Sequence, residues 1–263
     1  MTRVALVGGG RIGEALLGGL LASGWAEPAD LVVVEPVAAR RDELAERYAG
    51  IGVSDVAVDA DGAVVAVKPG QVEGACVALS GCSVGRVLSI AAGVTLTRLE
   101  AALAPGTPVV RAMPNTPALV GAGAAAIAGG THAGADDLDW AESVLGAVGQ
   151  VVRVDESLLD AVTGLSGSGP AYVFLVAEAL IEGGVLAGLP RDVSVELTVA
   201  TLLGSARLLA ETGDDPAALR AAVTSPAGTT AAGLQVLEER ATRAAFIGAV
   251  AAAAARSRQL AGD

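Results

Sequence analysis

The chain has few of the residue types that carry metal, redox or acid–base chemistry. Its 263 residues include one histidine, His132, and two cysteines, Cys76 and Cys82. The cysteines lie close together in the sequence with no histidine near them, which favours packing thiols over metal ligands or a disulfide. His132 stands beside glycines in a predicted loop. The composition therefore argues against a metal centre and against a Ser–His triad.

Basic and aromatic residues are also scarce. The chain has 17 Lys and Arg residues and 29 Asp and Glu residues, so its formal net charge is −12. Aromatic residues make up 2% of the chain. Nucleic-acid binding relies on clustered cations and on aromatic stacking platforms, and the sequence offers neither. With 52% hydrophobic and 17% charged residues, the chain is instead typical of a globular protein.

The apolar runs do not have the length that a membrane span requires. The run at residues 244–255 is among the longest, and it is too short and too rich in alanine to cross a bilayer. Arg3 is followed at once by an apolar strand pattern and a glycine loop, a pattern unlike that of a secretory leader. We therefore expect a cytoplasmic protein with no membrane and no nucleic-acid partner.

Glycine is abundant, and one glycine motif organises the start of the chain. Residues 4–7 form an apolar run, residues 12–21 have helical spacing, and G-x-G-x-x-G lies between them at Gly8, Gly10 and Gly13. We expect Gly8 to make the turn, Gly10 to allow close approach of a ligand, and Gly13 to let the helix pack on the strand. The helix start then offers unpaired N–H groups to a pyrophosphate. The alternative is a glycine-rich turn in some other α/β domain.

An acidic residue follows the second predicted strand, at residues 30–35. Glu35 lies about twenty residues beyond Gly13, where a carboxylate meets the adenosine ribose hydroxyls. That placement favours NAD. Arg40 and Arg41 follow on the next predicted helix and are placed to reach a 2′-phosphate, so the choice between NAD and NADP stays open. The alternative for Glu35 is a solvated strand end.

Three further loops follow predicted strands. Lys68, the only lysine of the chain, comes directly after the strand at residues 62–67, at the edge where open α/β sheets bind ligands. Small residues at 91–93 follow the next strand and leave room for a flat group. Asn115 stands between two prolines in a rigid turn. The alternatives are a solvated lysine for Lys68 and an ordinary turn for Asn115.

The order of elements predicts the fold class. Strands are predicted at residues 4–7, 30–35, 50–53, 62–67, 86–90, 107–111, 122–128 and 150–154, with helices between most of them. This alternation predicts a Rossmann-type doubly wound α/β sheet over residues 1–155. From residue 156 to 263 only helical periods remain. Because this half is rich in Ala, Leu and Gly, we expect an all-α domain that dimerises through its surplus apolar faces.

The second candidate anion site is the segment S-P-A-G-T-T at residues 225–230. Ser225 is expected to be the N-cap of a helix and Pro226 its first residue. Its N–H groups, with the hydroxyls of Ser225, Thr229 and Thr230, are placed to hold a carboxylate. The alternative is a well-capped helix without a ligand.

Reduction of a carbonyl needs a proton donor, whereas a protonated imine carries its own positive charge and needs mainly hydride alignment.

Six motifs together resemble the pyrroline-5-carboxylate reductase family over nearly the whole chain. They lie at residues 8–13, 66–69, 91–94, 111–117, 163–172 and 222–230. The resemblance implies a Rossmann domain, a helical dimerisation domain, dimers that often assemble into decamers, and reduction of 1-pyrroline-5-carboxylate to proline with NADPH or NADH. It implies cofactor contacts at Gly8, Gly10, Arg11, Ile12, Gly13, Ala66, Val67, Lys68, Pro69, Ala91, Ala92, Gly93 and Asn115, to which the spacing after Gly13 adds Glu35. It implies substrate contacts at Glu156, Ser225, Gly228, Thr229 and Thr230, with Thr230 as the candidate for assisting protonation.

Two departures from the family pattern bear on the site. Ala227 replaces the first glycine usual in S-P-G-G-[AT]-T, and Glu35 stands where relatives that favour NADPH often carry a neutral or basic residue. The nearest rival is a β-hydroxyacid dehydrogenase, which resembles this architecture but relies on a lysine in its helical half. Residues 156–263 contain no lysine, which counts against that rival. A non-catalytic dinucleotide-binding dimer would need the glycine loop but not the 225–230 segment.

Overall fold

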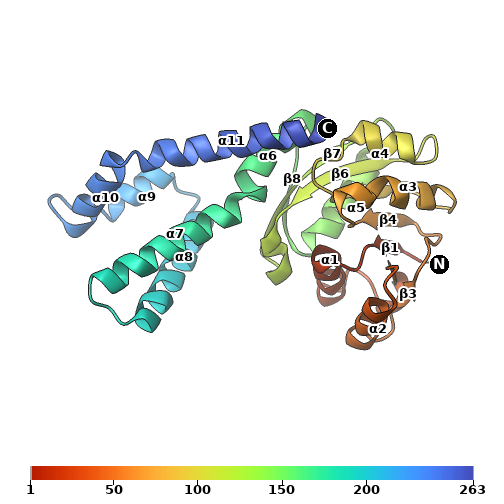
Figure 1. Cartoon of the computed structure of the whole chain (residues 1–263), viewed down its shortest axis with the longest axis horizontal. Coiled ribbons are helices and arrows are strands. Elements are labelled where there is room, and N and C mark those ends of the chain that lie inside the picture. The colour runs from red at the N-terminus through yellow and green to blue at the C-terminus, as the bar shows by residue number, and fades with distance from the viewer. Residues whose placement is uncertain (1, 263) are drawn as a thin grey trace. The chain divides into compact units, whose positions relative to one another are not determined.

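The computed structural model describes residues 2–262 and divides the chain into two compact units (Figure 1). The first unit runs as far as Ser168 and takes in the final segment from Ala252 onward. The second unit is Gly169–Ala251. The predicted domain division between residues 155 and 156 lies shortly before the junction at Ser168, and it stays a prediction.

The first unit is built on one eight-stranded sheet. Its strands are β1 (Val4–Val7), β2 (Leu31–Val34), β3 (Gly52–Ser54), β4 (Gly62–Val65), β5 (Val87–Ser89), β6 (Val109–Pro114), β7 (Gly123–Gly129) and β8 (Gly149–Arg153). The order across the sheet is β3-β2-β1-β4-β5-β6-β7-β8. Only the β6–β7 pair is antiparallel. The eight predicted strands and the Rossmann-type fold class are confirmed.

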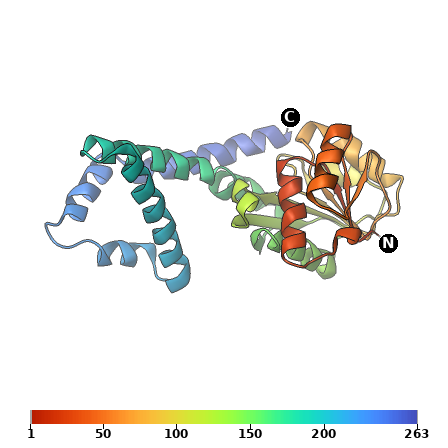
Figure 2. The same ribbon diagram turned by 90° about the horizontal axis from the view of Figure 1, so that it is seen from below.

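Helices cover both faces of this sheet. They are α1 (Arg11–Ala22), α2 (Ala38–Arg47), α3 (Val72–Ser80), α4 (Leu96–Ala102), α5 (Ala135–Gly146) and α6 (Leu159–Val162). Short 3₁₀ turns lie at η1 (Pro28–Asp30), η2 (Pro69–Gln71), η3 (Thr116–Val120) and η4 (Glu156–Leu158), and a π turn at η5 (Thr163–Gly167). Figure 2 shows α1 lying across one face of the sheet.

Alternate strand residues supply the two halves of the core. On one face Leu6 packs with Leu16 of α1 and Leu145 of α5, and on the other Val65 packs with Leu79 of α3 and Leu99 of α4. Burial on both faces explains why the strands read as continuous apolar runs. Cys76 belongs to this core, and burial raises the pKa of its thiol to about 11, as a packing thiol requires.

The strand order fixes where a ligand site can form. β1 lies between β2 and β4, with Val4 opposite Leu31 on one side and Gly62 on the other. The chain therefore reverses its direction of winding between β1 and β4. In sheets of this kind the crevice at the carboxyl ends of the strands flanking that point is the usual ligand site. The loops after β1, β4, β5 and β6 all end at this edge.

The second unit contains only helices among its described residues. They are α7 (Gly169–Leu186), α8 (Arg191–Thr212), α9 (Pro216–Ala222), α10 (Thr229–Glu239) and α11 (Thr242–Gly262), the last of which ends in the first unit. α7 and α8 pack closely because Gly184 has no side chain. A Cβ there would stand 2.2 Å from the Oγ of Ser194, and that hydroxyl donates to the Ile181 carbonyl at 2.8 Å.

Large apolar side chains remain uncovered on these helices. Phe174 is 63% exposed, Leu203 61% and Leu186 90%. The segments Glu156–Leu186 and Arg191–Thr212 are also long and apolar enough to cross a membrane, a weak criterion that core helices of soluble proteins pass as well. A group of large apolar side chains exposed in this way on a globular protein marks an interaction site.

Candidate functional site

The glycine loop has the geometry predicted from its spacing. Gly8 has φ +110°, and a Cβ there would lie 2.8 Å from the Ala66 carbonyl oxygen at the end of β4. A Cβ on Gly13 would lie 2.1 Å from the Gly8 carbonyl oxygen. Gly10 is the N-cap of α1, and a Cβ there would meet no described atom within 4 Å. The turn at Gly8 and the close packing at Gly13 are confirmed, and Gly10 leaves the helix start open.

Glu35 lies at the end of β2 and faces the glycine loop. Its carboxylate accepts the Gly9 N–H through Oε2 and the Val37 N–H through Oε1, both at 3.0 Å. The charge therefore sits beside the loop on the side where a Rossmann fold receives the adenosine ribose. The bonds give Glu35 a fixed position, which a solvated strand end would not have.

The two arginines after Glu35 have protein partners. Arg40 donates from Nε to the Gly9 carbonyl at 2.8 Å, and it pairs with Glu14 of α1 and with Glu43. Arg41 donates from Nη1 to the carbonyl oxygen of Glu35 at 2.7 Å. Both guanidinium groups are therefore held beside the glycine loop by protein acceptors.

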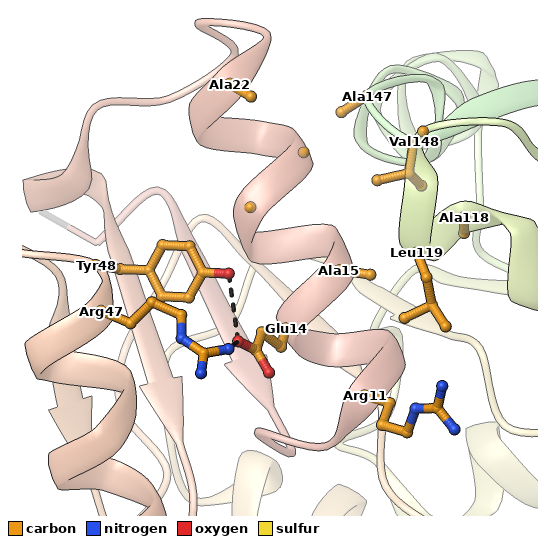
Figure 3. Close-up of a pocket in the computed structure, with 13 residues that line it drawn as sticks. Arg11, Glu14, Ala15, Ala22, Arg47, Tyr48, Ala118, Leu119, Ala147 and Val148 are labelled. Atoms are coloured by element: carbon orange, nitrogen blue, oxygen red, sulfur yellow. Dashed lines mark hydrogen bonds and ion pairs between the residues drawn. The ribbon is translucent and has the colours of Figure 1, made fainter.

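A groove of about 440 Å³ runs beside α1, and the polar side chains that line it lie on two sides (Figure 3). Glu14 points toward Arg47 and Tyr48, with which it is bonded, while Arg11 lies on the other side near Leu119. Burial raises the pKa of Glu14, but its bonds to Arg40 and Arg47 outweigh this, so the pKa is lowered. Glu14 thus stays ionised and anchors the arginine that holds Gly9.

A cavity of about 290 Å³ opens at the carboxyl edge of the sheet. Its lining residues come from α1, from the loops after β4 and β5, from the end of β6, and from the π turn: Ile12, Ala66, Val67, Pro69, Ile90, Ala91, Ala92, Met113, Pro114, Asn115, Thr116 and Gly167. Seven of the predicted cofactor contacts therefore share one cavity. The lining is mostly apolar, with Asn115 and Thr116 as its polar side chains, as is usual for a site that binds a ring.

Other predicted cofactor residues lie around this cavity. Gly93 lines a neighbouring cavity of about 520 Å³, which shares Pro69 and Ala92 with the first. Lys68 lies in the same loop as Pro69 with its side chain exposed. Arg11 faces the groove beside α1, at the open end of the glycine loop.

Sequence reasoning missed several lining residues. Gly167 lies far along the chain, beyond the predicted end of the sheet, and reaches the cavity only because the π turn packs on β6. Met113 and Pro114 belong to a motif that the sequence singled out, but only Asn115 was taken from it. The glycines of the S-G-S-G-P stretch at residues 166–170 were the available signal. In the structure a Cβ on Gly167 would lie 2.7 Å from the Met113 Cε.

The Asn115 amide is bonded on both sides. Its Oδ1 accepts the Ala124 N–H at 2.8 Å, and its Nδ2 donates to the Ser166 carbonyl at 3.1 Å. The side chain therefore links the start of β7 to the π turn while also lining the cavity.

Glu156 forms a half-buried ion pair with Arg111. The Arg111 side chain on β6 is 8% exposed and donates to Glu156 Oε1 at 2.8 Å. The same oxygen accepts the Leu96 N–H at 2.7 Å, which is the first N–H of α4. The carboxylate compensates a buried charge and caps a helix, so its position has a structural explanation within the first unit.

The 225–230 segment begins its helix later than the sequence predicted. The N-cap of α10 is Gly228 and not Ser225, and Pro226 lies outside the helix. The Gly228 N–H bonds the Ser225 carbonyl at 3.0 Å, and Ala227 has φ 60°. Proline followed by a left-handed residue is the pattern of a type II turn, which explains the shift. Ser225, Gly228, Thr229 and Thr230 all lie in the second unit.

Comparison with known proteins supports these assignments of fold and family. Residues 156–260 match the family described as pyrroline-5-carboxylate reductase dimerisation, and residues 3–93 match one described as NADP oxidoreductase, coenzyme F420-dependent. A pyrroline-5-carboxylate reductase of Synechocystis is 46% identical, with 98% of each chain covered.

Solved structures agree. A pyrroline-5-carboxylate reductase from Coxiella burnetii matches with TM-score 0.93 at 37% identity, covering 98% of each chain. One from Plasmodium falciparum, solved with NADP bound, matches with TM-score 0.83 at 27% identity, covering 99% of this chain and 98% of that one. On the strength of this identity over almost the full length of both sequences, the chain belongs to the pyrroline-5-carboxylate reductase family.

Proposed function

We propose that the protein reduces 1-pyrroline-5-carboxylate to L-proline with NADPH or NADH. The observation that carries this proposal is the chemistry of the 290 Å³ cavity: none of its described lining residues has a titratable side chain. A site of this kind can align a ring but has no group that protonates a carbonyl. It suits a substrate whose C=N nitrogen already carries a proton.

The reaction balances without a group from the protein. The reduced nicotinamide supplies a hydride to the carbon of the C=N bond, and the electron pair of that bond moves to the nitrogen. Because that nitrogen is already protonated, the product is a neutral secondary amine. The chain contributes the positions of the reactants, with Ala91 and Ala92 leaving room for a flat ring and Pro69 stiffening the loop that lines the same cavity.

For the cofactor we propose a path from the glycine loop to this cavity. The N–H groups at the start of α1 take the pyrophosphate, and Glu35 lies toward the adenosine end. The full set is the predicted one: Gly8, Gly10, Arg11, Ile12, Gly13, Glu35, Ala66, Val67, Lys68, Pro69, Ala91, Ala92, Gly93 and Asn115. The choice between NADPH and NADH rests on the groups around Glu35.

For the substrate carboxylate we propose the turn at residues 225–228 and the start of α10. The dipole of an 11-residue helix favours an anion at this end. Ser225, Gly228, Thr229 and Thr230 supply N–H and hydroxyl donors. Thr230 assists protonation of the imine nitrogen before the hydride step, and Glu156 is the remaining predicted contact. Residues 156–263 then form the dimerisation and substrate domain.

The exposed apolar side chains of α7 and α8 fit a homodimer, and the dimerisation family match covers both helices. We propose that the partner of this surface is a second copy of the chain and not a lipid bilayer, with a decamer as a higher assembly. The net charge of −12 supports a protein without a nucleic-acid partner, and we propose a cytoplasmic location.

The test is to mix the purified protein with 1-pyrroline-5-carboxylate and either cofactor and to follow the near-ultraviolet absorbance of the reduced nicotinamide. Loss of that absorbance, dependent on the imine, supports the proposal. Turnover of a β-hydroxyacid with the oxidised cofactor in its place would indicate the dehydrogenase, and no turnover of either would indicate a binding protein.

A pair of threonine variants tests the substrate site. T230A is expected to raise the KM for the imine at least severalfold while the cofactor affinity stays unchanged. T224A is the matched control, since Thr224 lies just before the turn and donates to the Arg220 carbonyl at 2.6 Å. Equal loss of imine and cofactor affinity in T230A would mean that the two sites are misplaced.

A further inference from the structure

The helical run from Leu159 into α7 is interrupted by a π turn at η5 (Thr163–Gly167). Its signature is the bond from the Ser168 N–H to the Thr163 carbonyl at 2.8 Å, five residues back. One extra residue is thereby inserted into the helix. Such insertions are rare and are frequently found at functional sites.

Pro170, just after the π turn, removes the α-helical donor of one carbonyl. In an α-helix the Ser166 carbonyl would accept the N–H of residue 170, but residue 170 is proline and has no N–H. A half-buried carbonyl left without a donor is unfavourable. The Asn115 Nδ2 fills this place, donating to the Ser166 oxygen at 3.1 Å. Asn115 is the only asparagine in the chain.

The Asn115 side chain is itself held from the opposite side. Its Oδ1 accepts the Ala124 N–H at 2.8 Å, at the start of β7. The amide orientation is fixed by these two partners, because only an oxygen can accept from Ala124 and only an N–H can donate to Ser166. Asn115 thus fastens the π turn to the sheet at the point where β6 ends.

Gly167, the next residue after Ser166, forms part of the cavity wall. It lies against Met113, which lines the same cavity, and a Cβ on Gly167 would come within 2.7 Å of the Met113 Cε. The position of the Ser166–Gly167 backbone therefore determines how much space remains at the end of β6.

We propose that Asn115 is a positioning residue for the nicotinamide pocket, acting through its bond to the Ser166 carbonyl, which holds Gly167 and Met113 at the pocket wall. This rests on the proposed function in one respect, that the cavity receives the nicotinamide. It goes beyond the proposed cofactor contact of Asn115, since the Asn115 oxygen and an Asn115 N–H are bonded to the protein and hold the pocket wall.

The decisive variant is N115D, which keeps the shape and the acceptor for Ala124 but removes the donor to Ser166. An ionised Asp places two acceptors face to face, so the π turn moves and the pocket wall shifts. Dissociation constants for NADPH and NADH, measured by fluorescence titration of the dimeric protein at pH 8, are expected to rise about tenfold, which corresponds to about 1.4 kcal/mol.

Acid should rescue this variant. As the pH falls through the titration range of the new carboxyl, which the facing carbonyl raises from the ordinary Asp value of about 4, the acid O–H becomes a donor to Ser166. The ratio of N115D to wild-type dissociation constants is therefore expected to return toward one. A side chain that only filled space would give a ratio independent of pH.

The matched control is S166A. It removes a hydroxyl that bonds the Val162 carbonyl at 3.1 Å but keeps the backbone carbonyl that Asn115 uses, so cofactor affinity should stay within twofold of wild type. If N115D does not fold by circular dichroism, N115A and N115S replace it. The cofactor affinity of N115A is expected to fall about tenfold, and that of N115S to lie between N115A and wild type.

Unchanged cofactor affinity in N115D at pH 8, a pH-independent ratio, or wild-type affinity in N115S would each overturn the proposal. Because the readout is cofactor binding, it is separate from the proposed reaction. Failure of the wild-type protein to reduce the imine would refute the proposed function and leave this result standing.

Discussion

Gly13 in the first turn of α1 lies against the carbonyl group of Gly8, so close that a Cβ on Gly13 would stand 2.1 Å from the Gly8 oxygen. No rotamer change relieves an overlap with backbone. We predict that G13A lowers the free energy of unfolding by about 3 kcal/mol and abolishes cofactor binding. Urea unfolding and fluorescence titration measure the two effects.

G10A provides the contrast within the same loop. Gly10 has φ −71°, which alanine adopts freely, and a Cβ there would meet no described atom within 4 Å. Its stability should stay within about 0.5 kcal/mol of wild type, while the methyl obstructs the approach of a pyrophosphate. A stable G10A variant with full affinity for NADPH and NADH would show that the pyrophosphate binds elsewhere.

Cofactor choice should respond to the charge of Glu35. The Gly9 and Val37 N–H groups hold the Glu35 carboxylate in place beside the glycine loop. Because this carboxylate is negatively charged, it repels a 2′-phosphate placed nearby. We predict that E35Q raises the ratio of kcat/KM for NADPH to that for NADH about tenfold, equivalent to about 1.4 kcal/mol. Steady-state rates with both cofactors provide the measurement.

E46Q is the control for this experiment, because it removes one negative charge from the exposed face of α2 and keeps Glu43, which pairs with Arg40. Loss of the Glu46 charge should leave the cofactor ratio unchanged. Equal ratios in E35Q and wild type would mean that the 2′ position lies outside the reach of Glu35.

The ion pair of Glu156 with Arg111 separates a structural role from a substrate role. Removing the charge leaves the 8% exposed Arg111 side chain without its counter-ion, so E156Q should lose about 1–3 kcal/mol of stability. The KM for the imine should then change little. A higher KM with unchanged stability would instead support the predicted substrate contact. D155N, at the exposed neighbouring acid, is the control for both measurements.

The sequence predicted the eight strands because each is a short apolar run bounded by turn residues, and burial on both faces of a parallel sheet requires such runs. It also predicted the roles of Gly8 and Gly13, since the G-x-G-x-x-G spacing has one geometric solution between a strand and a helix. These are local patterns, and local sequence determines them.

What the sequence did not predict depends on contacts between distant segments. The π turn at Thr163–Gly167 contacts Asn115 and Met113, which lie about fifty residues earlier in the chain. No local periodicity in the sequence predicts this contact. The predicted start of α10 was wrong for a different reason. Ser225-Pro226 has the chemistry of an N-cap, but the same pair also begins a type II turn, and the turn prevailed.

The Glu14 cluster predicts a pH dependence of stability. Burial raises the pKa of Glu14, but the bonds to Arg40 and Arg47 lower it by a larger amount. The pKa of Glu14 therefore lies below 4.5 in the folded protein. A lowered folded-state pKa adds stability that is fully present above the unfolded value and is lost as the pH falls through the folded value. E14Q should therefore cost about 1–2 kcal/mol at pH 7, and the difference should shrink below about pH 4.5. Urea unfolding across this range measures it. E46Q, on the exposed face of α2, should show no such convergence.

Two alanines of the second unit adopt left-handed backbone conformations, Ala227 with φ 60° and Ala241 with φ 53°. This conformation costs alanine about 1 kcal/mol, and glycine avoids the cost but gains freedom in the unfolded chain. We predict that A227G and A241G each stabilise the protein by up to about 0.5 kcal/mol, while A227V destabilises it because a branched side chain is worse at positive φ. Thermal unfolding measures all three.

Activity distinguishes the two glycine variants. Ala227 lies in the turn proposed to hold the substrate carboxylate, whereas Ala241 lies between α10 and α11. A relaxed turn at residue 227 is more often in its binding-competent form, so the KM for the imine should fall in A227G and stay unchanged in A241G. If both variants gain stability and neither changes KM, the turn before α10 takes no part in binding the substrate, and the donors for its carboxylate must come from other residues.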